Sequence, residues 1–168
     1  MTYEQIIDKL KNKIYYPVYF LTGEEPYYID EISDYIEKNV LTDIEKEFNQ
    51  TIIYGRDTTV QSIISAAKRY PMMANYQVVI VKEAQDVQKI EDLEPYLENP
   101  LSSTLLVINY KYKKVDKRKT FAKLIEKKSV LFESKKLYDN QVPDWINSFI
   151  AQKGYRITTK ATSMLAEH

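Results

Sequence analysis

The chain has 168 residues, of which 24 are basic and 24 acidic, so its net charge of zero gives no sign of a nucleic-acid or membrane partner. It has no cysteine and one histidine, the terminal His168, which argues against disulfides, thiolate nucleophiles, histidine-based catalytic triads and zinc sites. No apolar run approaches the ~18 residues that cross a bilayer and no signal-peptide pattern opens the chain, so we expect a cytosolic protein without a membrane partner.

Helices and strands alternate along the first part of the chain. Thr2 and Gln5 have capping-box spacing, which predicts a first helix, and the apolar residues 18–21 predict a short buried strand. Pro26 suits the first turn of a second helix, and residues 48–54 predict a second strand.

The same alternation continues to residue 132. Asp57 or Thr58 is expected to cap a helix that ends ahead of Pro71. Residues 77–81 (QVVIV) lack polar alternation, as a central parallel strand does. Asp116 is expected to cap a later helix. The remaining predicted elements are a helix over 90–97 and strands over 104–108 and 129–132.

Strands that alternate with helices predict right-handed crossovers and an α/β fold, with a five-stranded parallel sheet covered by helices on both faces. The pattern changes after Leu137. A helical stripe over 142–150 and another helix that begins at Thr158 or Thr159 are followed by no strand. We therefore expect a sheet domain over residues 1–137 and the start of a small helical domain, cut short, over residues 138–168.

The turn after the first strand has the outline of a phosphate-binding loop without its chemistry. A working loop reads G-x-x-x-x-G-K-[ST], but residues 28–30 (YID) hold its last three places here. The carboxylates of residues 24–25 bring negative charge where phosphate would lie, and suit the amino end of the following helix instead. We therefore expect no nucleotide cofactor. The residues of this degenerate loop are Gly23, Glu24, Glu25, Tyr28, Ile29 and Asp30.

The second element of a nucleotide site, the end of the central strand, also lacks the residues that bind a nucleotide with magnesium. ATPases of this architecture end the central strand with an aspartate that holds magnesium and a glutamate that orients water. Here Lys82 and Glu83 follow the strand, and the lysine ammonium would repel magnesium, so no metal site is expected. The alternative is that the sheet never was a nucleotide fold and that the alignment is accidental.

Two methionines, Met72 and Met73, stand side by side between a helix end and a strand. Adjacent residues on a short turn point in different directions, so the two side chains are not expected to share one core. Exposed methionine adapts to a partner's apolar pocket, which makes this pair, with the flanking Tyr70 and Pro71, a candidate docking site. The alternative is that the pair plugs the edge of the sheet.

Residues 110–119 form a basic segment with interleaved tyrosines after the carboxyl end of a strand, where ligands collect in parallel sheets. Such a segment can bind phosphate backbones and stack on bases. The alternative is a solvated loop and helix face. The candidate DNA-contacting residues are Lys111, Lys113, Lys114, Lys117 and Arg118.

Three strings point to a known family: PVYFLTGEEPYYIDEI, AAKRYPMMANYQVVIVKEAQD and LLVINYKYKKVDKRKTFAKLI. Along essentially its whole length the chain resembles the amino-terminal part of the delta subunit of the bacterial DNA polymerase III clamp loader. The resemblance implies a degenerate AAA+ ATPase-like domain, a helical lid domain that is cut short here, and a collar domain that is missing.

The resemblance also implies a function. Delta opens the ring-shaped sliding clamp (the beta subunit) during DNA replication, without binding ATP and without enzymatic activity of its own. Family members insert two adjacent bulky apolar side chains into an apolar pocket of the clamp, and the matching positions are Met72 and Met73. The implied partners are the clamp, the gamma or tau motor subunits and delta-prime, with DNA met only within the complex. Without the collar, the chain is expected to bind the clamp but not to join the loader.

Two other functions stay open on the residues alone. One is a nucleotide hydrolase with an unusual loop, which ATP binding would indicate. The other is a nucleic-acid-binding α/β domain that uses Lys111 to Lys119, which steeply salt-dependent DNA binding would indicate.

Overall fold

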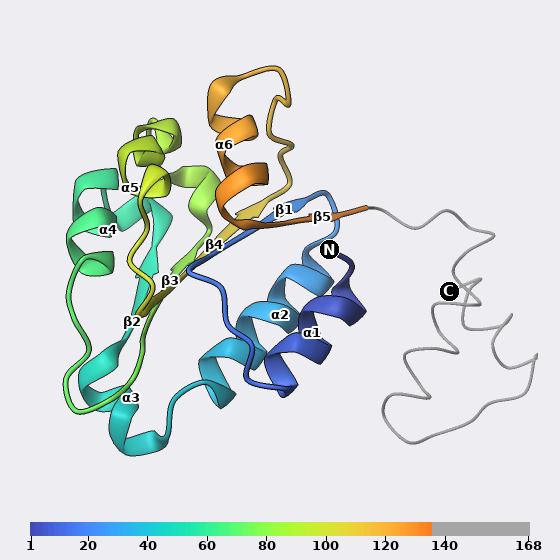
Figure 1. Cartoon of the computed structure of the whole chain (residues 1–168). Coiled ribbons are helices and arrows are strands. Elements are labelled where there is room, and N and C mark those ends of the chain that lie inside the picture. The colour runs from blue at the N-terminus through green and yellow to red at the C-terminus, as the bar shows by residue number, and fades with distance from the viewer. Residues whose placement is uncertain (136–168) are drawn as a thin grey trace, which may run out of the picture. The chain divides into compact units, whose positions relative to one another are not determined.

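Five parallel strands form the framework of residues 1–135, the part of the chain that this computed structural model describes (Figure 1). They lie in the order β2-β3-β4-β1-β5 and every neighbouring pair is parallel, which confirms the predicted α/β sheet. The middle strand is β4, so the predicted central strand, β3, lies one place away from the centre. The strands are β1 (Val18–Gly23), β2 (Gln50–Tyr54), β3 (Gln77–Lys82), β4 (Thr104–Lys111) and β5 (Val130–Ser134).

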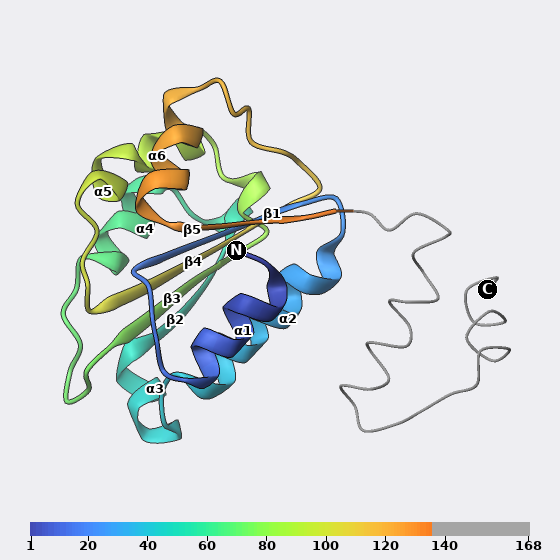
Figure 2. The same cartoon turned by 45° about the vertical axis from the view of Figure 1, so that its right-hand side comes forward.

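Helices cover both faces of the sheet (Figure 2). On one face lie α1 (Tyr3–Lys11) and α2 (Pro26–Asn39), and on the other lie α4 (Val60–Ala67), α5 (Glu94–Glu98) and α6 (Thr120–Lys128). The short helix α3 (Asp43–Asn49) precedes β2. Three 3-10 turns complete the elements: η1 (Gly55–Asp57), η2 (Ala84–Asp86) and η3 (Ile90–Leu93).

The interior strands are apolar on both faces because each face meets a layer of helices. In β3, Val79 and Val81 belong to the core on the α4 side, whereas Val78 and Ile80 belong to the core on the α2 side. β1 and β4 divide their side chains between the same two cores. The absence of polar alternation in these strands therefore indicated correctly that both of their faces are buried.

The first two helices begin as the sequence predicts. Thr2 and Gln5 form the capping box of α1, and Pro26 opens α2 behind Glu25. Helix α3 is not among the predicted helices, although Thr42 and Glu45 form a second capping box there. Because α3 continues to Asn49, the prediction of a strand from residue 48 is wrong for its first two positions.

Two predicted helix caps are wrong. Neither Asp57 nor Thr58 caps α4, because η1 occupies the preceding turn and Thr59 accepts the hydrogen bond from the Ser62 backbone N–H at 3.2 Å. Asp116 does not cap α6, because Arg118 occupies its carboxylate and the helix begins after Lys119.

The remaining boundaries differ by a few residues. The predicted helix over 90–97 is divided into η3 and α5, since Pro95 starts a new first turn. β4 extends to Lys111 because it pairs with the whole of β1, and β5 covers 130–134 rather than 129–132. The helices predicted over 142–150 and after Thr158, and with them the domain over 138–168, lie outside the described residues.

Candidate functional site

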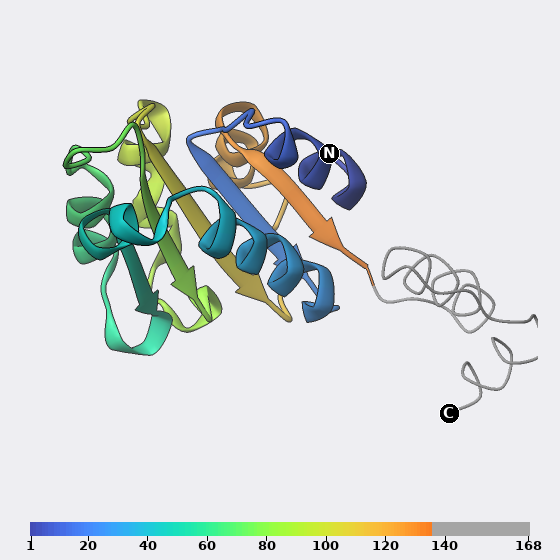
Figure 3. The same ribbon diagram turned by 90° about the horizontal axis from the view of Figure 1, so that it is seen from below.

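The methionine pair and the degenerate nucleotide site lie at opposite ends of the strands. All five strands run the same way, so their amino ends share one edge and their carboxyl ends the other (Figure 3). The segment of residues 68–76, called the methionine loop below, leads from α4 into the amino end of β3. The degenerate phosphate loop and Lys82 lie at the carboxyl edge.

The methionine loop presents its apolar side chains to solvent. Met72 is 63% exposed, Met73 is 102% exposed and Tyr70 is 74% exposed, while Pro71 is half-buried. The methionines therefore do not plug the edge of the sheet. Met73 also adopts a left-handed backbone conformation with a φ of 56°, which costs a residue with a side chain on the order of 1 kcal/mol.

Two buried amide side chains hold the methionine loop to the sheet domain. Asn49, at the end of α3, accepts a hydrogen bond from the Met72 N–H and donates one to the Met72 carbonyl oxygen. Gln77, the first residue of β3, places its Nε2 within hydrogen-bond distance of the Arg69 carbonyl oxygen. Sequence reasoning identified neither amide, because Asn49 and Met72 are 23 positions apart and no local pattern links them.

At the carboxyl edge, only two residues join β1 to α2, which leaves no loop to surround a phosphate. Glu25 Oε1 accepts the hydrogen bond of the Tyr27 backbone N–H at 3.1 Å, and Pro26 has no N–H. Phosphate sites at helix N-termini depend on these amide donors, and one carboxylate and one proline remove them here. The expected contact of Glu25 with the helix end is confirmed. Tyr28 is half-buried and Ile29 is fully buried.

The glycine that begins the degenerate loop serves close packing of the strands. Gly23 has a φ of 126°, and a Cβ added to it would lie 2.0 Å from the Ser134 carbonyl oxygen in β5. The neighbouring strand therefore occupies the space beside Gly23. This close approach explains the glycine without a phosphate ligand.

Lys111 bridges the two degenerate elements. Its Nζ lies 2.7 Å from Asp30 Oδ1 on α2 and 3.9 Å from Glu83 Oε1 after β3. The lysine side chain is only 13% exposed, and burial by itself lowers its pKa. The hydrogen bond and charge of Asp30, with the charge of Glu83, outweigh burial and raise the pKa of Lys111 above its ordinary value.

These residues do not fit a nucleotide with magnesium. Asp30 holds the place where a phosphate-binding loop has its serine or threonine hydroxyl, and Glu83 holds the place of the glutamate after the strand. The ammonium of Lys111 lies between these two carboxylates. Lys82 Nζ lies 3.7 Å from Glu37 Oε1 and adds a second cation. In the described part of the chain, no group of three or more histidine or acidic side chains is placed to hold a metal ion.

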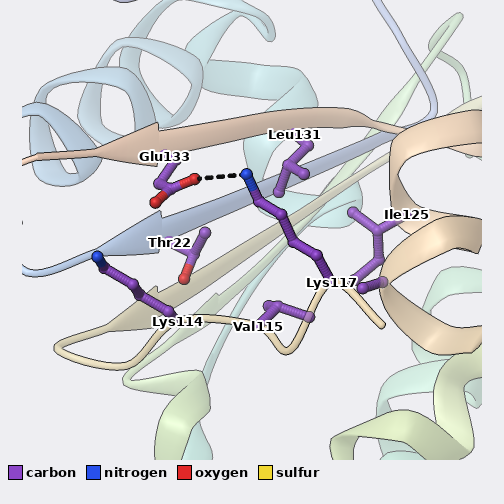
Figure 4. A pocket seen from close by; sticks show the side chains of 8 residues that line it. Thr22, Lys114, Val115, Lys117, Ile125, Leu131 and Glu133 are labelled. Atoms are coloured by element: carbon purple, nitrogen blue, oxygen red, sulfur yellow. Dashed lines mark ion pairs between the residues drawn. The ribbon is translucent and has the colours of Figure 1, made fainter. Parts of the chain in front are cut away.

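The basic segment borders a pocket of about 280 Å³ between β1, β5 and α6 (Figure 4). Lys117 reaches across it to Glu133, with Nζ 3.4 Å from Oε2, and Lys114 lies at its rim. Arg118 pairs with Asp116. Since Lys111 also faces inward, only Lys113 and Lys114 of the candidate DNA-contacting residues are exposed without an ion pair within 4.0 Å among the described residues.

No helix within residues 1–135 combines the length and apolar character needed to cross a membrane. This finding agrees with the charged residues distributed along the sequence.

The chain is similar in sequence to known proteins. Residues 19–135 match the family described as "DNA polymerase III, delta subunit". A curated relative, DNA polymerase III subunit delta of Bacillus subtilis, is 29% identical over 169 residues, which cover 95% of this chain and 48% of the relative.

Solved structures share the fold. The Bacillus subtilis DNA clamp loader delta protein matches with a TM-score of 0.80 and 24% identity, over 97% of this chain and 51% of that one. A gamma-subunit-related protein of DNA polymerase III from Thermotoga maritima matches with a TM-score of 0.53 and 15% identity, over 96% and 57% of the two chains. The RuvB Holliday junction branch migration motor of Thermotoga maritima has a TM-score of 0.53 and 12% identity, over 97% and 55%. The chain spans about half the length of these relatives.

Proposed function

The chain belongs to the DNA polymerase III delta subunit family, and from this premise we propose that it binds the sliding clamp through Met72 and Met73 and opens the ring without binding ATP. Its proposed partners are the clamp, the gamma or tau motor subunits and delta-prime, and it meets DNA within that assembly. It acts in the cytoplasm as an accessory subunit of the polymerase and has no reaction of its own.

The exposure of the methionine pair carries this proposal. A folded domain seldom leaves two adjacent large apolar side chains at 63% and 102% exposure unless a partner covers them. Methionine side chains are flexible and polarisable, so they fill an irregular apolar pocket well. Tyr70 and Pro71 extend the same surface with an aromatic ring and a stiff backbone.

Opening the ring follows from differential binding. A ligand shifts an equilibrium between closed and open rings only by the difference of its affinities for the two states. Burial of two methionine side chains supplies at most ~3–6 kcal/mol before the costs of ordering are subtracted. This binding energy opens the ring only to the extent that the clamp's pocket accepts the methionine pair better in the open ring than in the closed one.

The absence of ATP binding is part of the proposal. It is supported by the two-residue turn at Gly23, by the occupied amide of Tyr27, and by the Lys111 ammonium between two carboxylates. Calorimetric titration with ATP and magnesium should give no heat of binding. A clear binding isotherm would exclude the mechanism and favour the nucleotide hydrolase.

The clamp assignment is tested by titrating the cognate clamp with wild type and with Met72→Ala/Met73→Ala. We expect the double variant to bind ~100-fold more weakly, since it loses about 3 kcal/mol of apolar burial. Tyr112→Ala provides the control, because Tyr112 is 61% exposed and lies at the opposite edge of the sheet. Release of the clamp from circular DNA measures opening. Equal binding by the wild type and the double variant would disprove the assignment.

A further inference from the structure

We propose that Asn49 is a positioning residue that holds the Met72–Met73 pair in the conformation that enters the clamp. The inference rests on the proposed function of the methionine loop and adds a residue that neither the loop sequence nor the family comparison identifies. Asn49 acts through the backbone of Met72 and lies outside the methionine loop.

The geometry uses every strong hydrogen-bonding group of the Asn49 side chain. Oδ1 accepts a hydrogen bond from the Met72 N–H at 2.6 Å. Nδ2 has two protons, of which one is donated to the Met72 carbonyl oxygen at 2.9 Å and the other to the Glu45 carbonyl oxygen at 3.0 Å. The side chain thus bonds both backbone groups of one loop residue, as a neighbouring strand would.

The residues around Asn49 strengthen its hydrogen bonds to the Met72 backbone. Asn49 is only 3% exposed, so water competes little for its hydrogen bonds. Glu45 fixes the amide from within α3, and α3 itself is held at its start by the capping box of Thr42. The bond to Met72 therefore ties the loop to the last residue of a capped helix.

The contact lies next to the part of the loop that carries strain. Met73 follows Met72 directly and combines a left-handed backbone with complete exposure of its side chain. Nothing in the side chain of Met73 can maintain that conformation in solvent, so the restraint comes from its neighbours. Met73 is restrained from both sides. Before it, the backbone of Met72 is bonded to Asn49; after it, β3 begins at Gln77, whose backbone N–H donates a hydrogen bond to the Ser103 carbonyl oxygen at 2.9 Å.

A loop that is ordered before binding loses less conformational entropy when it binds, and affinity rises accordingly. Without Asn49 the methionine pair would sample other conformations, and the clamp would bind only the fraction that is competent. We therefore expect Asn49→Ala to weaken clamp binding by about tenfold while Met72 and Met73 remain present.

The first measurement needs no clamp. Amide hydrogen exchange in the 168-residue chain should show that Asn49→Ala lowers the protection of the Met72 N–H by at least about tenfold, with the amides of β3 unchanged. Asn49→Asp keeps an acceptor for this N–H but replaces Nδ2, which faces the Met72 and Glu45 carbonyl oxygens at 2.9 and 3.0 Å, with an oxygen that those carbonyls repel. It should therefore lower the protection of the Met72 N–H as well. Asn12→Ala is the matched control, because Asn12 donates the same i−4 bond, to the Asp8 carbonyl oxygen at 2.9 Å, at the end of α1. Unchanged protection of Met72 in Asn49→Ala would overturn the inference.

The second measurement is clamp affinity, with melting curves to show that each variant is folded. In a double-mutant cycle of Asn49→Ala and Met73→Ala, the two losses of clamp affinity should overlap. The affinity of the double variant should then fall by less than the product of the two single fold-changes. A loss equal to the full product would show that Asn49 acts independently of the methionine pair, and it would overturn the inference.

The results also separate the inference from the proposed function. If Met72→Ala/Met73→Ala loses binding and Asn49→Ala binds as Asn12→Ala does, the inference is wrong and the proposed function stands. If the methionine double variant binds as the wild type does, the proposed function fails and the inference fails with it.

Discussion

Replacement of Lys111 by methionine should lower the free energy of unfolding by about 1–2 kcal/mol. A hydrogen bond to a charged group contributes about 1.5–3 kcal/mol, and the bond from Lys111 Nζ to Asp30 Oδ1 is short at 2.7 Å. Solvent screening reduces this value because the Asp30 side chain is 50% exposed, and Glu83 at 3.9 Å adds little. Methionine keeps most of the apolar stem, so the change reports mainly the ammonium.

The effect has a defined pH dependence. The pKa of Lys111 is raised in the folded chain, because Asp30 and Glu83 outweigh burial. The folded state therefore holds the proton more tightly than the unfolded state does. The stability that Lys111 contributes is fully present below its ordinary pKa of 10.5 and is lost as the pH rises through the higher pKa of the folded state.

Urea unfolding at pH 7 measures the difference between wild type and variant, and a series up to pH 11 should show it shrinking. Lys113→Met is the control: Lys113 is exposed, so the free energy of unfolding should change by less than about 0.5 kcal/mol. Asp30→Asn should cost a similar amount to Lys111→Met, and the double variant should cost less than their sum. A Lys111→Met chain as stable as the wild type, or additive losses in the double variant, would refute the reasoning.

Three further predictions concern other parts of the sheet domain. Gly23→Ala should cost at least ~3 kcal/mol or abolish folding, because its Cβ would meet the Ser134 carbonyl oxygen; an unchanged urea midpoint would contradict this. Burial raises the pKa of Tyr19 to about 12, as it does that of Tyr27, so stability should fall between pH 10 and 12, and the phenols that titrate near 12 in absorbance should be fewer by one in Tyr19→Phe. Lys113→Gln/Lys114→Gln should leave DNA affinity unchanged; a salt slope reduced by about two would instead show phosphate contacts.

The fold was accessible from the sequence because its signals are local. Apolar runs such as 77–81 identify strands that are buried on both faces, and Pro26 and the Thr2 capping box fix helix starts. The errors arose where two local signals compete. Thr42 and Glu45 form the capping box that begins α3, whereas Phe48 favoured a strand. In the structure Phe48 is 67% exposed near the end of the helix, so the local cap and not core packing accounts for it.

Among the candidate site residues, those with a local signal could be predicted from the sequence and those that depend on distant partners could not. Met72 and Met73 could be singled out because two large apolar residues on a turn are unusual in any context. Asn49 and Lys111 could not, because their roles depend on partners 23 positions away in one case and on two different elements in the other. Lys111 was grouped with a basic segment by its neighbours in sequence, whereas in the structure it faces Asp30 and Glu83.

Strand β3 joins the two edges of the sheet. It begins at Gln77, directly after the methionine loop, and ends at Lys82, beside the carboxylate that faces Lys111. The strand spans about 20 Å, its first five residues are buried, and it is paired on both sides, with β2 and β4. The methionine loop and the Lys111 site are therefore connected by one buried strand of six residues, so a change that displaces β3 at one end would alter the surroundings of both.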